Sequence, residues 1–108
     1  MNPLTFASLP WKPFHPGVTI WRIFGDGIRG ASAALLKYAP GARIPRHHHA
    51  GVEIVAVLRG SQTDEEGTIV AGGLRVNHPN TDHSVRSDDG CIVLVVWEVP
   101  VVFERSES

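Results

Sequence analysis

Glycine and proline divide the apolar residues of this chain into short runs, and this punctuation constrains the fold more than any other feature. The 108 residues include 11 glycines and 8 prolines, and both residue types interrupt regular structure at turns. The runs between them recur at roughly 8–12-residue spacing, which is typical of β-sandwiches and barrels. We therefore expect one all-β domain, since a domain usually takes about 100–200 residues.

The expected strands lie between these turn residues. No segment has a convincing helical stripe, and Ala31–Tyr38 is too short between its flanking glycines and prolines to favour a helix. Ile92–Trp97 is apolar at every position, which favours a strand covered on both faces. The expected strands are Val18–Phe24, Ala31–Ala39, Val52–Arg59, Thr68–Val70, Leu74–Asn77, His83–Arg86, Cys91–Glu98 and Val101–Glu104.

The first 17 residues differ from the rest of the chain. Four prolines in this segment argue against a paired strand, because proline has no N–H to donate. Trp11 and Phe14 are expected to pin the segment to the barrel surface; exchange of the segment with a second subunit is the alternative. We expect an extended N-terminal arm over residues 1–17 and a barrel over residues 18–108.

Charge and cysteine content exclude several classes of protein. The net charge is −1 and no long stretch carries one sign, which argues against a nucleic-acid-binding face. Cys91 is the only cysteine, so an intramolecular disulfide and a cysteine-based zinc cage are excluded. No apolar run approaches the ~20 residues that span a bilayer, and Met1 to Trp11 lack the pattern of a signal peptide. We expect a soluble, cytoplasmic protein that binds neither nucleic acid nor membrane.

Histidines cluster in the middle of the sequence. Three of the six are adjacent, at His47, His48 and His49. Residues i and i+2 of a strand point to the same side, so His47 and His49 can bind one metal ion while His48 points away. Metals of the iron and zinc type favour imidazole together with carboxylate ligands.

Glu53 can join these histidines only if the chain reverses direction. Six residues of straight strand would place it about 20 Å from His47, whereas metal–ligand bonds are about 2 Å long. Ala50-Gly51 suits a reversal, because glycine tolerates positive φ. The returning strand would then place Val55 and Val57 on the same inner face as Glu53. His83, which follows a turn-like segment, could supply a fourth ligand.

Two segments resemble the motifs of the cupin superfamily. Residues 41–60 read G-x5-H-x-H-x3-E-x6-G, which is similar to the first cupin motif at every fixed position. The second motif, G-x5-P-x-G-x2-H-x3-N, is matched at Gly72 and His83, while His78, Asn80 and Ser87 replace the other three residues. Asparagine at position 80 is a mild change, since asparagine also tolerates the left-handed conformation.

The resemblance implies a single-domain cupin jelly-roll barrel, a double-stranded β-helix, with one divalent metal ion. Zinc, iron, manganese and nickel are all open. The expected ligands are His47, His49, Glu53 and His83. Because cupin barrels commonly pair through their sheets, the resemblance also implies a homodimer.

Three further segments are similar to one cupin branch, the cupin-like domain of ChrR-type anti-sigma factors. They are Trp11–Val18, Thr63–Gly67 and Asp88–Cys91. Such factors also carry an N-terminal helical, zinc-binding domain that holds the sigma factor, and we expect this chain to lack it. What the resemblance implies is the sensing or binding half, a metal-bearing barrel that takes a small-molecule ligand.

The sequence leaves two main classes of function open, and a metal-free binding barrel is a third option. Four protein ligands would complete a tetrahedral zinc site and favour a non-catalytic ligand- or redox-sensing module. An octahedral iron, manganese or nickel would keep two open positions, as an oxygenase or isomerase of a small oxygen-rich molecule requires. No catalytic residue is assigned. Tyr38 and His78 are candidates for the pocket, and Asp64–Glu66 is expected to be a solvated hairpin.

Overall fold

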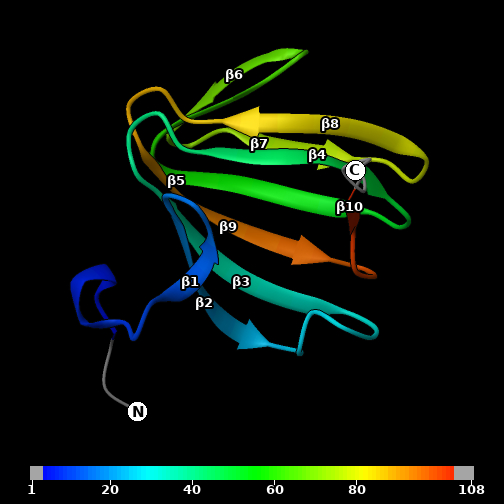
Figure 1. The fold of residues 1–108 in the computed structure, drawn as a ribbon, viewed down its shortest axis with the longest axis horizontal. Helices are drawn as coiled ribbons and strands as arrows, with labels where there is room; N and C mark the ends of the chain where they lie inside the picture. The colour runs from blue at the N-terminus through cyan, green and yellow to red at the C-terminus, as the bar shows by residue number, and fades with distance from the viewer. Residues whose placement is uncertain (1–3, 104–108) are drawn as a thin grey trace.

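The computed structural model, which describes residues 4–103, is a curled antiparallel β-sheet (Figure 1). Within those residues the one helical element is a 3-10 turn, η1 (Phe6–Ser8), and no helix is long and apolar enough to cross a membrane. The strands are β1 (Lys12–His15), β2 (Val18–Phe24), β3 (Ser32–Tyr38), β4 (Arg43–His49), β5 (Glu53–Asp64), β6 (Gly67–Val70), β7 (Leu74–Asn77), β8 (Thr81–Arg86), β9 (Cys91–Trp97) and β10 (Val102–Phe103).

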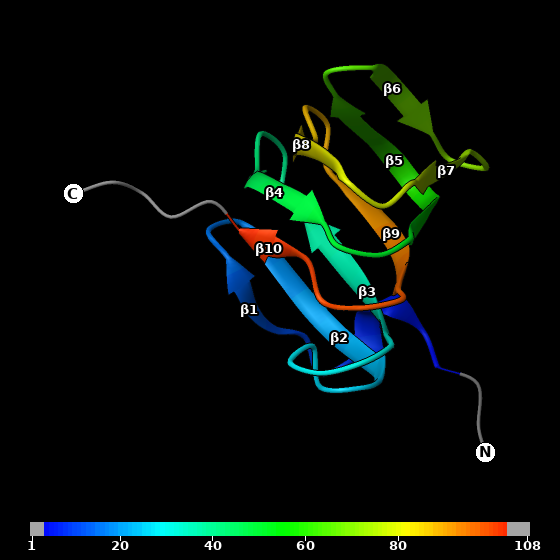
Figure 2. The ribbon, with the colours of Figure 1, turned by 90° about the vertical axis from the view of Figure 1, so that its right-hand side faces the viewer.

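The sheet curls into a barrel because β5 belongs to both of its halves. The strand order is β1-β2-β3-β9-β5-β8-β4-β10. The first part of β5 pairs with β9 and β7, and its end, Ser61–Asp64, pairs with β6. Figure 2 shows the strands following this curved path. The two ends of the path meet where the rings of His15 on β1 and Phe103 on β10 lie 5.0 Å apart. The expected all-β barrel is therefore confirmed.

Inward-facing side chains, which alternate with outward-facing ones along each strand, fill the interior of the barrel. The central strand β9 lies between β3 and β5 and buries Val93 and Val95 completely or nearly so, with 0% and 2% of their surface exposed. Leu94 and Val96 of the same strand are only partly buried, so its outer face is less covered than its apolar sequence predicts. Val55 and Val57 of β5 point inward as expected.

Two strands lie outside the expected ranges. β4 carries the histidine run, and β1 falls within the N-terminal segment where prolines argued against pairing. Pro13 is tolerated because β1 is an edge strand; it lies opposite Thr19 of β2, next to a register shift. The arm expected over residues 1–17 thus contains a strand of the sheet. At the other end, β10 covers Val102 and Phe103, while Glu104 of the expected strand lies outside the described residues.

Candidate metal centre

Three strands bring the four predicted ligands together. On β4 the side chains alternate, so His47 and His49 point inward, and His47 lies opposite His83 of the neighbouring strand β8. The chain then turns over residues 50–52 and begins β5 with Glu53.

The turn requires Gly51 for its space rather than for its backbone conformation. Its φ is not positive, contrary to the reason expected from the sequence. A Cβ at this position would lie 2.8 Å from both a carboxylate oxygen of Glu98 and a methyl carbon of Val99. Glu98 in turn accepts a hydrogen bond from the backbone N–H of Val52. The close approach of these two segments therefore fixes where Glu53 begins its strand.

The four side chains form a buried cluster that can hold a metal ion. Each offers one nitrogen or oxygen atom, and these atoms lie within 4.8 Å of one another. The Nε2 atoms of His47 and His83 are 3.0 Å apart, and Nε2 of His49 lies 3.4 Å from Oε1 of Glu53. All four residues are at most 5% exposed.

Each imidazole has its Nδ1 held by a hydrogen-bond acceptor. The Nδ1–H of His47 donates to the carbonyl of Pro45 at 2.9 Å. That of His49 donates to the hydroxyl of Thr81 at 2.9 Å, whose own proton goes to the carbonyl of His78. A neutral imidazole carries one N–H, so its other nitrogen then presents a lone pair. The hydrogen bonds outside the cluster thus direct lone pairs into it.

The Nδ1 atom of His83 also has a hydrogen-bond acceptor outside the cluster, and in this case the acceptor is a carboxylate. Its Nδ1–H donates to Oδ2 of Asp64 at 2.9 Å, and Arg75 forms an ion pair with the same carboxylate. Burial opposes the ionisation of Asp64, but Arg75 and His83 together hold its pKa at about 2. A carboxylate behind a metal-binding histidine orients the ring and raises its basicity.

Glu53 is held as an ionised carboxylate. Oε1 accepts a hydrogen bond from Nδ2 of Asn77 at 2.9 Å, and Oε2 accepts one from Nε1 of Trp97 at 2.7 Å. Burial alone would raise the pKa of Glu53, yet that pKa lies below its ordinary value because His49 and the other imidazoles surround the carboxyl. Burial lowers the pKa of His47 and so favours its neutral, metal-binding form.

The residues present fit a metal ion. Nε2 of His49 is buried and has no hydrogen-bond partner among the residues that the structure describes. An unpaired buried polar atom is costly, and here a bound cation would satisfy it together with the facing lone pairs of His47 and His83. Three imidazoles and one carboxylate are a donor set that zinc, iron and nickel accept.

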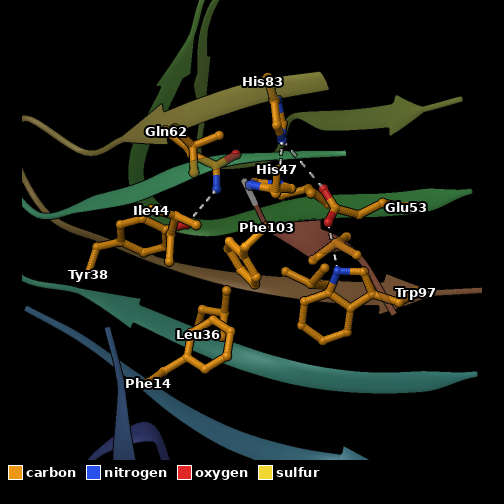
Figure 3. A pocket seen from close by; sticks show the side chains of 14 residues that line it. Phe14, Leu36, Tyr38, Ile44, His47, Glu53, Gln62, His83, Trp97 and Phe103 are labelled. Atoms are coloured by element: carbon orange, nitrogen blue, oxygen red, sulfur yellow. Dashed lines mark hydrogen bonds and ion pairs between the residues drawn. The ribbon is translucent and has the colours of Figure 1, made fainter. Parts of the chain in front are cut away.

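A largely apolar cavity of about 30 Å³ adjoins this cluster on the inside of the barrel. Figure 3 shows His47, His83 and Glu53 at one end and Tyr38 at the other. Tyr38, one of the two predicted pocket residues, lies in the lining of this cavity. The exposed His78 does not; it borders a separate polar depression on the surface.

Sequence reasoning missed several residues that support the ligands. Asp64 was expected in a solvated hairpin, but its side chain is only 4% exposed, because β5 runs on to this residue and places it behind His83. No signal in the sequence separates it from its exposed neighbours Glu65 and Glu66. Trp97 could have been found, because it shares the inward parity of Val93 and Val95 on β9.

Comparisons with known proteins agree with this arrangement. The family model of the ChrR cupin-like domain matches residues 3–100. The anti-sigma-E factor ChrR of Cereibacter sphaeroides is 31% identical over an alignment 93 residues long; the match takes in 77% of this chain and 44% of that protein. The chain therefore spans less than half the length of this relative.

Solved structures show the same fold. An RmlC-like cupin protein from Ralstonia eutropha JMP134 is 27% identical, with a TM-score of 0.81 over 97% of this chain and 73% of that one. An acetylacetone dioxygenase from Acinetobacter johnsonii is 14% identical, with a TM-score of 0.84 over 98% of this chain and 78% of that one, and shares the fold alone. Taken with the match of the family model over most of the sequence, these findings show that the chain belongs to the ChrR cupin-like domain family.

Proposed function

We propose that this protein binds one divalent transition-metal ion through His47, His49, Glu53 and His83, and acts as a small-molecule or redox sensing module. The observation that carries the proposal is the outward pairing of the three Nδ1 atoms. Because each Nδ1 donates its proton to an acceptor outside the cluster, the three Nε2 lone pairs converge with the Glu53 carboxylate.

The protein holds the buried ligand side chains from outside the cluster. Trp97 and Asn77 hold the two oxygens of Glu53, and the paired Asp64 and Arg75 hold the ring of His83. When bound, a metal ion that keeps an open coordination position beside these four ligands would act as a Lewis acid towards an oxygen atom of a ligand in the adjoining cavity. The relative ChrR is named as an anti-sigma-E factor, and a binding module whose metal site responds to a small molecule or oxidant fits the half of that protein that this chain matches.

Metal analysis of protein purified without a histidine tag tests the proposal. We expect about one metal ion per chain in the wild type, from a site of four ligands, and little or none in the double variant His47→Ala/His49→Ala. The double variant must keep its β-sheet circular dichroism for the comparison to count. Equal metal content in the two folded proteins would reject the site.

The second candidate is a metal-dependent oxygenase or isomerase acting on a small oxygen-rich substrate. The cavity favours it, because apolar walls lead directly to His47 and Glu53 and a six-coordinate metal would keep positions free for a substrate. The metal itself distinguishes the two candidates. Zinc held by four protein ligands favours the sensing module, whereas a redox-active metal with exchangeable water favours the enzyme.

A further inference from the structure

The cavity beside the metal centre has a second polar end. In Figure 3, Tyr38 and Gln62 lie together on the side away from Glu53. Gln62 comes from the far part of β5 and Tyr38 from the end of β3, so both project into the cavity from strands that have curled around it. The walls between the two ends are apolar and include Leu36 and Ile44.

Tyr38 and Gln62 are buried and only partly satisfied. They are 3% and 5% exposed, and Nε2 of Gln62 donates to the hydroxyl oxygen of Tyr38 at 3.3 Å. Among the described residues, nothing accepts the hydroxyl proton of Tyr38 and nothing donates to Oε1 of Gln62. Both groups therefore keep hydrogen-bonding capacity beyond their mutual contact, at the end of the cavity away from the metal centre.

Such a pair is costly unless something binds to it, because a buried polar group loses its hydrogen bonds with water. Burial also raises the pKa of Tyr38 far above its ordinary value, so the hydroxyl remains a donor. A carboxylate is disfavoured at this position, because its negative charge would lie against the partial negative charge of Gln62 Oε1. A neutral group that both donates and accepts would satisfy both atoms.

We propose that Tyr38 and Gln62 form a subsite for a hydroxyl or carboxamide group of a small ligand whose opposite, oxygen-bearing end lies at the metal centre. This inference rests on the proposed function, since the metal centre anchors the other end of the ligand. The cavity of about 30 Å³ has room for roughly two or three non-hydrogen atoms, since one water takes roughly 10–15 Å³, so it holds only the short chain and terminal group of a ligand whose acid group lies at the metal centre. The ligand class is thus a short carboxylic acid or similar metal-binding compound with a terminal hydroxyl or amide.

Two acids of matched size test the subsite. 3-Hydroxypropionate and butyrate differ only in a terminal hydroxyl against a methyl group. Calorimetry on the metal-loaded wild type should show that 3-hydroxypropionate binds roughly threefold to tenfold more tightly, the effect of one or two neutral hydrogen bonds. Tyr38→Phe keeps the ring and removes the donor, so it should abolish this preference. Gln62→Leu should reduce it, and gives the same comparison if Tyr38→Phe does not fold.

Metal content is measured on every sample, which separates the two proposals. A wild type that binds no metal overturns the proposed function. A metal-loaded wild type that binds both acids equally, or neither, overturns the subsite alone and indicates that the pair is satisfied by water. A preference that persists in the folded Tyr38→Phe and Gln62→Leu variants also overturns it, because the hydroxyl would then be contacting the metal.

Discussion

The two faces of β4 carry the same residue type in opposite surroundings. On the inner face, His47 and His49 are 4% and 1% exposed. On the outer face, His48 has a side chain that is 40% exposed and pairs with Asp82 at the surface. His48 and His49 are adjacent in the sequence. The Nε2 atom of His49 points into the buried cluster, whereas Nδ1 of His48 contacts a carboxylate at the surface. Strand alternation, and not the number of adjacent histidines, therefore decides which imidazoles enter the candidate metal centre.

Removing one histidine from each face of β4 should give the largest difference in metal affinity. His49→Ala removes one of four ligands, so metal affinity should fall by more than the roughly 10–100-fold that loss of an outer partner causes. His48→Ala removes a side chain of the same type from the other face and should leave metal affinity unchanged. Competition with a chromophoric chelator measures both variants. A similar loss in the two would contradict the comparison.

The carboxylates that contact His83 and His48 should give the next largest difference in metal affinity. Asp64→Asn removes the charged acceptor of the His83 Nδ1–H, and metal affinity should fall about 10–100-fold. Asp82→Asn, the matched change behind His48, should leave it unchanged. The same chelator titration serves here. An unchanged affinity in Asp64→Asn would show that the ring of His83 needs no charged partner.

The inner carboxylate should also make the metal-free protein sensitive to acid. The pKa of Asp64 is about 2 in the folded chain, against 3.8 ordinarily, so the unfolded chain takes up the proton first as the pH falls. The stabilisation is complete above about pH 4 and is lost as the pH approaches 2, and its size is on the order of 2 kcal/mol.

Urea unfolding of metal-free protein between pH 7 and pH 2 measures this loss. The free energy of unfolding should depend less on pH in Asp64→Asn than in the wild type over the range from pH 4 to pH 2. Identical profiles for the two proteins would show that Asp64 has the same pKa folded and unfolded.

The smallest effect concerns the neutral acceptor of His49. Thr81→Val removes the hydroxyl that accepts the His49 Nδ1–H, and metal binding should weaken by about 0.5–1.5 kcal/mol, the range for one neutral hydrogen bond. Thr68→Val is the control, because the Thr68 hydroxyl bonds to Thr63 on β5. A loss of affinity in Thr68→Val as large as in Thr81→Val would point to a general change in the sheet.

Three of the four candidate ligands, His47, His49 and Glu53, could be predicted to converge because their arrangement depends on local spacing. The i, i+2 relation of His47 and His49 follows from strand geometry, and a turn at Ala50-Gly51 was needed to return Glu53. The reason given for that turn was wrong, since the φ of Gly51 is not positive and the residue instead lies against Val99 and Glu98 from the segment after β9. A contact between segments so far apart in the sequence leaves no local pattern.

The supporting residues could not be predicted for the same reason. Asp64 becomes buried only because β5 extends beyond Arg59, where the expected strand ended, and meets His83 across the curled sheet. Gln62 reaches the cavity through the same extension. Gly60 has a φ of 72° and lies where β5 passes from one half of the sheet to the other. Because glycine usually interrupts a strand, the sequence predicted that the strand would end before this residue.

X-ray absorption spectroscopy of the metal-loaded protein can identify the four proposed ligands, because it reports which atoms surround the metal. We expect three imidazole nitrogens at about 2.0–2.1 Å for zinc, together with a carboxylate oxygen, and loss of one imidazole in His49→Ala but none in His48→Ala. A shell of oxygens with one imidazole or none, or a spectrum that changes in His48→Ala, would contradict it.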